Sequence, residues 1–169
     1  QTRSPHPHVF NLTATPIPRT IALGLFGEID ISTIKNNPQK DKNIKTFVVE
    51  KNHLEKKGFT WLEERLDRND KIFVVAPLIS KGKTSLSSAE EIYKKYHQVF
   101  GKKFPIYLLH GKIDEDKKQS IIENFKKDKS AILVATPVIE VGIDIKDATT
   151  IIIHSAERFG LASLHQLRG

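Results

Sequence analysis

A polar, glycine-bearing segment follows the apolar run 131–135 and could bind a ligand. The run itself (AILVA) is short and aliphatic, which is typical of a strand buried on both faces of a parallel sheet. The polar residues behind it are Thr136, Glu140, Gly142 and Asp144. Ligands of open parallel sheets collect at the carboxyl ends of the strands, so this segment is a candidate site. An ordinary strand-to-helix turn is the alternative interpretation.

A second polar segment, His110-Gly111-Lys112, follows the apolar run 105–109. Because the carboxyl ends of parallel strands meet at one edge of a sheet, we expect both segments at that edge. A histidine, a flexible glycine and a lysine could hold phosphates there, although a plain turn would have the same residues. Glu140 stands in an aliphatic context and needs a hydrogen-bond partner, so either a structural or a functional role is open to it.

Gly82-Lys83-Thr84 matches the end of the phosphate-loop pattern G-x-x-x-x-G-K-[ST] and also follows an apolar run. The first glycine of that pattern belongs at position 77, where this chain has Pro77. Proline lacks the backbone N–H and the free φ that a phosphate cradle needs. The segment is therefore interpreted as an exposed loop.

The elements that must position these residues alternate between strand and helix from residue 44 onward. Apolar runs predict strands over 46–50, 71–76, 105–109, 131–135 and 149–153. Periodic apolar positions predict helices over 53–68, 86–100, 114–127 and 161–167. In the first helix, Leu54, Trp61, Leu62 and Leu66 are expected on the buried side. This alternation predicts the α/β class with a mainly parallel sheet.

Composition excludes several classes of protein. The chain has 169 residues, enough for one domain with a core, and a formal charge of +7 that favours a polyanionic partner. It has no cysteine, so disulfides and thiolate metal sites are excluded, and its histidines show no metal-ligand spacing. No apolar run approaches the roughly 20 residues that span a bilayer. We expect a cytoplasmic protein without a membrane partner.

Read together, these segments resemble the motifs of superfamily 2 helicases in order and spacing. Residues 12–20 (LTATPIPRT) resemble motif III, and residues 73–79 (FVVAPLI) resemble motif IV. Residues 131–144 resemble motif V, and residues 164–169 (LHQLRG) resemble the opening of motif VI. TATPIPRT, ERFGL and QLRG together are similar to the branch that contains RecG and the transcription-repair coupling factor.

The resemblance implies a RecA-like three-layer domain of the phosphate-loop NTPase type that serves as the second motor lobe. Residues 1–43 would be the end of the first motor domain with a linker, and residues 44–169 the second RecA-like domain. Such helicases hold ATP between the two lobes, with single-stranded DNA crossing both.

The family's functional positions fall on particular residues of this chain. Motif III, which couples hydrolysis to DNA engagement, corresponds to Thr13, Ala14, Thr15 and Arg19. The residues that would hold DNA are His110, Gly111, Lys112, Thr136 and Glu140. The residues that would face the nucleotide, and so act in catalysis, are Gly142, Asp144 and Gln166. No metal ligand is assigned within this chain.

The chain also departs from the family pattern. Pro137 stands where relatives usually have threonine, which removes one hydroxyl and one N–H beside the DNA path. The motif VI arginines, a true phosphate loop and the acidic magnesium-binding motif are not found in the sequence. We therefore expect a parent protein that uses ATP and Mg²⁺, and an isolated chain that binds neither tightly and does not hydrolyse ATP.

The resemblance further implies forked or branched DNA as substrate in DNA repair and recombination. The expected partners within the parent are the first motor domain and an N-terminal DNA-recognition domain. Two alternatives stay open: a translocase of the coupling-factor type, and a nucleotide-independent α/β module that binds nucleic acid.

Overall fold

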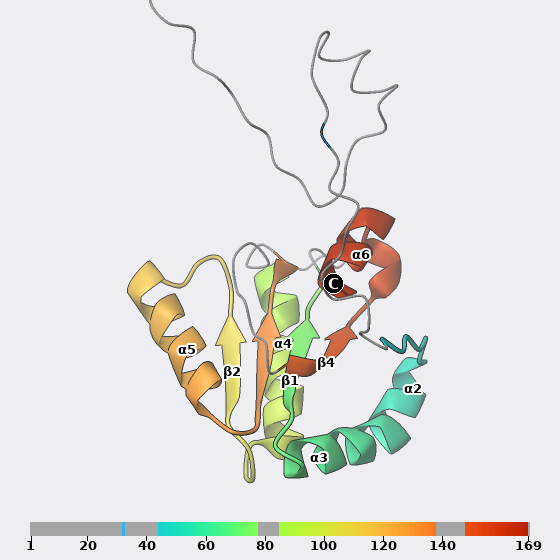
Figure 1. The fold of residues 1–169 in the computed structure, drawn as a ribbon, viewed down its shortest axis with the longest axis horizontal. Helices are drawn as coiled ribbons and strands as arrows, with labels where there is room; N and C mark the ends of the chain where they lie inside the picture. Colours follow the sequence, from blue (N-terminus) through green and yellow to red (C-terminus); the bar gives the residue numbers. More distant parts are fainter. Residues whose placement is uncertain (1–31, 33–43, 78–84, 138–147, 169) are drawn as a thin grey trace, which may run out of the picture. The chain divides into compact units, whose positions relative to one another are not determined.

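The computed structural model describes residues 32, 44–77, 85–137 and 148–168 (Figure 1). The chain divides into two compact units, Gln1–Lys45 and Thr46–Gly169, and every described helix and strand belongs to the second. The exposed loop expected at 82–84 lies outside the described residues. The assignment of residues 1–43 to a separate motor domain stays a prediction.

The second unit alternates between helices and strands, as the apolar runs predicted. In chain order its elements are α2 (Lys51–His53), the π-helix η1 (Leu54–Gly58), α3 (Phe59–Asp67), β1 (Lys71–Val75), α4 (Ser85–Phe100), β2 (Ile106–Leu109), α5 (Glu115–Lys127), β3 (Ala131–Ala135), β4 (Ala148–Ile153), the 3₁₀-helix η3 (Ala156–Arg158) and α6 (Leu161–Arg168).

The four described strands form one parallel sheet in the order β2-β3-β1-β4. The last residues of the strands are in register, because Val75 pairs with both Ala135 and Ile153, and Leu109 pairs with Ala135. All four strands therefore end at the same edge of the sheet (Figure 1). This arrangement confirms the predicted fold class.

Helices cover both faces of the sheet, so the domain has three layers. Side chains alternate along β3: Ile132 and Val134 face a cluster with α3 and α4, whereas Leu133 faces a cluster with α5. Both clusters contain side chains that are 0% exposed, and every residue of β3 is buried. A strand that is buried on both faces has no polar position, which explains its uninterrupted aliphatic sequence.

Two expectations for the start of this unit are wrong. Residues 46–50 are not a strand, since they belong to no ladder of the sheet and the side chain of Val48 is 103% exposed. Trp61 was expected on the buried side of its helix, but it is 49% exposed while Leu62 and Leu66 are each 1% exposed. The helix predicted over 53–68 is present, but η1 interrupts its α-helical period before Trp61.

Candidate functional site

The carboxyl edge of the sheet brings two of the predicted segments together. Thr136 follows β3, and His110 follows the neighbouring strand β2. The Thr136 N–H donates a hydrogen bond to the Leu109 carbonyl oxygen at 3.1 Å, which continues the ladder past the last paired residues. The two segments are therefore adjacent, as the parallel arrangement required.

Thr136 is a buried polar residue, with only 4% of its surface exposed. Its backbone N–H is already used by the hydrogen bond to Leu109. A phosphate would reach the Thr136 hydroxyl only after the residues around it move. Pro137, which follows, is half-buried.

His110, Gly111 and Lys112 form a tight turn beyond β2. The Lys112 N–H donates to His110 Nδ1 at 3.3 Å, and the Ile113 N–H donates to the His110 carbonyl oxygen at 3.2 Å. Since Nδ1 accepts a hydrogen bond, the neutral imidazole carries its proton on Nε2, where it can donate. Gly111 and Lys112 are exposed, so the turn presents a cation to solvent at this edge.

The end of β4 adds a histidine that was not among the predicted site residues. The His154 N–H donates to the Val75 carbonyl oxygen at 3.0 Å, and the hydroxyl of Tyr96 lies 3.1 Å from His154 Nε2. Tyr96 is 0% exposed, and burial raises the pKa of its hydroxyl, so the phenol keeps its proton. His154 could have been found by the rule that identified His110, because it too follows an aliphatic run directly.

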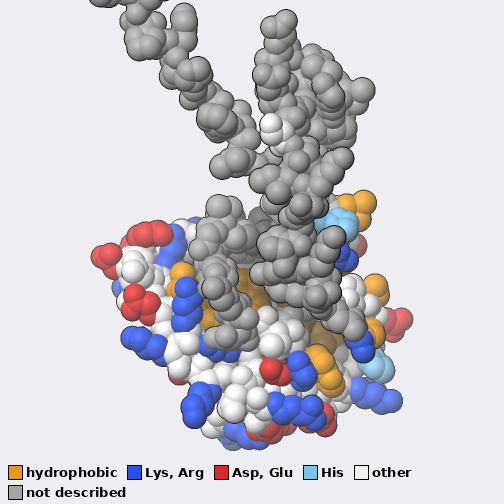
Figure 2. All heavy atoms as spheres, in the orientation of Figure 1, with side chains coloured by type: hydrophobic (Ala, Val, Ile, Leu, Met, Phe, Trp, Pro, Cys, Tyr) orange, Lys and Arg blue, Asp and Glu red, His pale blue; other side chains and the backbone are white. Residues whose placement is uncertain are grey.

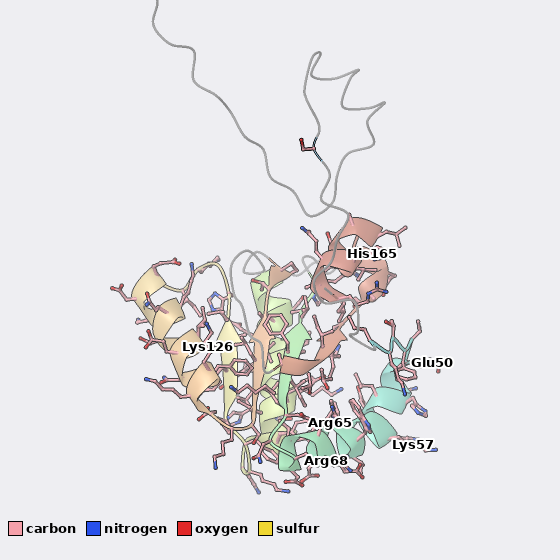
Figure 3. The ribbon with its side chains drawn as sticks, in the orientation of Figure 1. Glu50, Lys57, Arg65, Arg68, Lys126 and His165 are labelled. Carbon is pink, nitrogen blue, oxygen red and sulfur yellow. The ribbon has the colours of Figure 1, made fainter. Side chains whose placement is uncertain are left out.

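Gln166 lies on α6, beyond a sharp turn after β4. Ser155 has a left-handed backbone (φ 54°), and its carbonyl oxygen accepts a hydrogen bond from the Arg158 N–H at 2.9 Å. The following helix α6 has no buried residue, and both Gln166 and Leu161 are exposed. Figure 3 labels His165 on this helix, above β4 and away from the side of the sheet that carries the His110 turn.

The Gln166 side chain forms no hydrogen bond or ion pair with another described residue. The structure therefore joins Thr136 to the His110 segment but does not join Gln166 to either. The other predicted site residues lie outside the described part of the chain: Thr13, Ala14, Thr15, Arg19, Glu140, Gly142 and Asp144. Their roles stay predictions.

The described residues contain no group of three or more His, Cys, Asp or Glu side chains placed to hold a metal ion. None of the helices they form has the length and apolar character needed to cross a membrane.

A parallel α/β layer structure with polar turns at its carboxyl edge is the architecture of many nucleotide-dependent proteins. The family described as "Helicase conserved C-terminal domain" matches residues 57–169, and this chain belongs to it.

Curated relatives narrow the comparison to one kind of helicase. The chain is 42% identical over 168 residues to the ATP-dependent DNA helicase RecG of Aquifex aeolicus, and 41% identical over 165 residues to that of Streptococcus pneumoniae. It is also 37% identical to the chloroplastic/mitochondrial homolog RECG1 of Arabidopsis thaliana. These alignments cover 97%, 97% and 96% of this chain but only 20%, 24% and 17% of the relatives. The resemblance to RecG helicases seen in the motifs is confirmed.

Two solved structures match part of this chain. The second domain of the DEAD-box helicase Mss116p, bound to an RNA duplex, is 27% identical with a TM-score of 0.48, covering 57% of this chain and 36% of that chain. The C-terminal domain of the SWI2/SNF2 ATPase of Sulfolobus solfataricus is 19% identical with a TM-score of 0.43, covering 57% and 40%.

Proposed function

We propose that this chain is the second motor lobe of an ATP-dependent DNA helicase of the RecG type. The parent protein would unwind or branch-migrate forked DNA and recombination intermediates during DNA repair. The observation that carries this proposal is the 42% identity to a RecG helicase along 97% of the chain, since that identity spans the proposed DNA and nucleotide segments together. The match of residues 57–169 to helicase C-terminal domains supports it independently.

The DNA-binding part of the proposal rests on the carboxyl edge of the sheet. The turn His110–Lys112 and Thr136 would hold the DNA backbone, together with Glu140. Backbone amides, a histidine N–H and a lysine at strand ends contact phosphates without reading bases, which suits a motor that moves along any sequence. Since Thr136 is buried in this structure, the proposal requires that DNA binding uncovers its hydroxyl.

The nucleotide-binding part of the proposal concerns the positions of motifs V and VI. Gly142, Asp144 and Gln166 would face ATP between the two lobes, and Thr13, Ala14, Thr15 and Arg19 would couple hydrolysis to DNA. The first lobe would supply the phosphate loop and the carboxylates for Mg²⁺, which neutralises charge on the transferring phosphoryl group. The exposed amide of Gln166, on a helix with no buried residue, supports a role at an interface with the nucleotide and the other lobe.

We further propose that the parent acts in the cytoplasm on branched DNA, and that an N-terminal domain recognises the branch. Without the first lobe, the chain described by this sequence would not turn over ATP. A translocase of the coupling-factor type would use the same lobe. The DNA structure that stimulates ATP hydrolysis distinguishes such a translocase from a RecG-type helicase.

The test is ATP hydrolysis by the full-length parent on a model replication fork, with Thr136→Ala and Gln166→Ala as separate variants. Each variant should lower the fork-stimulated rate at least about tenfold, because contacts to DNA or to the transferring phosphoryl group contribute on the order of 1.4 kcal/mol or more to the barrier. Thr60→Ala and Gln98→Ala, on exposed positions of α3 and α4, are the matched controls and should keep the parental rate.

Full stimulation in both site variants would contradict the assigned roles. A folded parent without any DNA-stimulated hydrolysis would contradict the motor itself and leave a nucleotide-independent binding module.

A further inference from the structure

Exposed cations gather at the amino-terminal edge of the sheet, opposite the candidate site. Three connections lead from helices to strand starts at this edge: α3 to β1, α4 to β2 and α5 to β3. Figure 2 shows Lys and Arg side chains, interspersed with Asp and Glu, along the lower border of the molecule, where these connections lie. We define the basic rim as the exposed residues Arg68, Lys102, Lys126, Lys127 and Lys129.

Contacts between the connections make the rim one continuous surface. Lys103 Nζ lies 2.8 Å from Asp67 Oδ1, which joins the connection after α4 to the end of α3. The buried Lys71 Nζ donates to the Lys126 carbonyl oxygen at 2.8 Å, which joins the start of β1 to the end of α5. Figure 3 labels Arg68, which directly follows α3, and Lys126, which lies in the last turn of α5.

Four acidic side chains near the rim contact other groups, and two more, Glu64 and Glu123, are exposed beside Arg68 and Lys127. The four acids and their partners are Asp67 and Glu63 with Lys103, Asp70 with Arg65, and Asp128 with the Tyr107 hydroxyl. None of the five rim cations forms an ion pair with a described residue. The rim segments therefore carry a small net positive charge, since residues 63–71, 102–103 and 123–129 together contain eight Lys or Arg and six Asp or Glu.

Stabilisation of helix ends explains only part of this pattern. Lys126 and Lys127 lie in the last turn of α5, where cations favour the helix dipole. Lys102 and Lys129 lie beyond the last residues of α4 and α5, and the dipole's effect falls off within the last turn. Their number and exposure call for an anionic partner outside the chain.

We propose that the basic rim binds the phosphate backbone of duplex DNA, as a second contact separate from the carboxyl edge. Three neighbouring strands about 4.8 Å apart, with helices on both faces, give the rim a length of roughly 20 Å. Phosphates are spaced about 3.4 Å along one strand, so the rim faces about six of them. This contact would hold a duplex arm while the opposite edge engages the moving strand.

The chemistry of the rim favours duplex over single-stranded DNA. Proteins that bind single strands without sequence preference stack bases on exposed aromatic side chains. Three aromatic residues lie near the rim among those described: Phe104, 8% exposed, Phe125, 0% exposed, and the half-buried Tyr107. The Tyr107 ring packs against Phe125 and its hydroxyl donates to Asp128, so none of the three offers a free ring for stacking. Contacts to phosphates alone suit a duplex, whose bases are already stacked.

The test measures binding of a short fluorescent DNA duplex to the full chain by anisotropy, without nucleotide, between about 50 and 200 mM salt. The rim variant is Lys126→Gln/Lys127→Gln/Lys129→Gln. Its control, Lys56→Gln/Lys57→Gln/Lys94→Gln, removes the same charge from exposed cations elsewhere that also have no ion pair with described residues. The rim variant should bind about tenfold more weakly, with the log–log salt slope reduced by about 0.9 per lost contact. The control should stay within about twofold.

A second variant, Arg68→Gln/Lys102→Gln, should also weaken binding, since it removes rim cations from the other two connections. Circular dichroism and thermal unfolding check the fold of each variant, and single substitutions at Lys127 and Lys129, whose side chains are exposed, replace any triple variant that unfolds.

Equal losses in rim and control variants would contradict the proposal, because they would indicate net charge alone. Tighter binding of a single strand that depends on the rim would also contradict it. The proposal goes beyond the motor function and does not depend on it, because the assay contains no ATP and no other lobe.

Discussion

The hydroxyl of Tyr96 lies 3.1 Å from Nε2 of His154, and this contact joins the buried side of α4 to the carboxyl end of β4. The two rings also meet edge to face, with centroids 5.9 Å apart and planes at 85°. The other side of Tyr96 packs against Phe59, with ring centroids 5.4 Å apart. Contacts with the core therefore fix the position of His154, after which the chain turns toward α6.

Tyr96→Phe removes this hydrogen bond and keeps the ring. The free energy of unfolding, measured by urea denaturation, should fall by about 0.5–1.5 kcal/mol, the net contribution of one hydrogen bond. Tyr93→Phe, on the half-buried side of the same helix, is the control and should change it by less than about 0.5 kcal/mol. Equal effects of the two substitutions would contradict a specific role for the Tyr96 hydroxyl.

The environment of Tyr107 predicts that the folded state loses stability at alkaline pH. Its hydroxyl donates to Asp128 Oδ2 at 2.7 Å, and burial, followed by this hydrogen bond, raises the pKa of Tyr107 from 10.0 to about 12. The unfolded chain thus releases this proton at lower pH than the folded chain does. The contribution of Tyr107 to stability is complete below pH 10 and is lost as the pH rises to about 12.

Urea midpoints across this pH window should therefore fall more steeply for the wild type than for Tyr107→Phe. All other titrating groups are shared by the two proteins, so their contributions cancel in the difference. Parallel curves would contradict the raised pKa of Tyr107.

Asn69 ends α3 in the left-handed conformation, with φ 66°. The Asp70 N–H donates to the Arg65 carbonyl oxygen at 3.1 Å, and the Asn69 N–H donates to that of Leu66 at 3.0 Å, as expected where a helix closes on a left-handed residue. Asn69→Ala should destabilise the fold by about 1 kcal/mol, whereas Asn69→Gly should be neutral or slightly stabilising. The melting temperatures of the two variants are compared by calorimetry. An alanine variant as stable as the glycine variant would contradict the left-handed conformation of Asn69.

Leu133 lies at the centre of the sheet and is 0% exposed. Leu133→Ala leaves a cavity beside α5 and should lower the free energy of unfolding by about 2–5 kcal/mol. Leu161→Ala is the control, since Leu161 is 78% exposed and its truncation should cost less than about 0.5 kcal/mol. If Leu133→Ala lowered the free energy of unfolding only slightly, β3 would not be packed as described.

The sheet could be predicted because its strands are buried on both faces, which leaves uninterrupted aliphatic runs such as 131–135. Residues 46–50 have a similar composition but are no strand, because a strand also needs a neighbour to pair with, and pairing is not visible in a local pattern. Trp61 was misplaced because it lies about 100° around α3 from Leu62 and about 140° from Leu66, so the three side chains cannot share one buried face.

The site was predictable where a polar residue directly follows a strand, as with His110 and Thr136. The burial of Thr136 and the contact between Tyr96 and His154 depend on side chains distant in sequence, and no spacing rule gives them. The basic rim was invisible for the same reason, since its cations come together only when three connections meet at one edge.

The most direct test of the motor assignment compares ATP hydrolysis by the full-length parent protein on a forked DNA and on a linear duplex of the same length and composition. The proposed function predicts that the fork stimulates hydrolysis more strongly than the linear duplex and that fork arms are rearranged during the reaction. Equal stimulation by both DNAs without rearrangement would contradict the RecG-type assignment, and no stimulation by either would contradict a DNA motor.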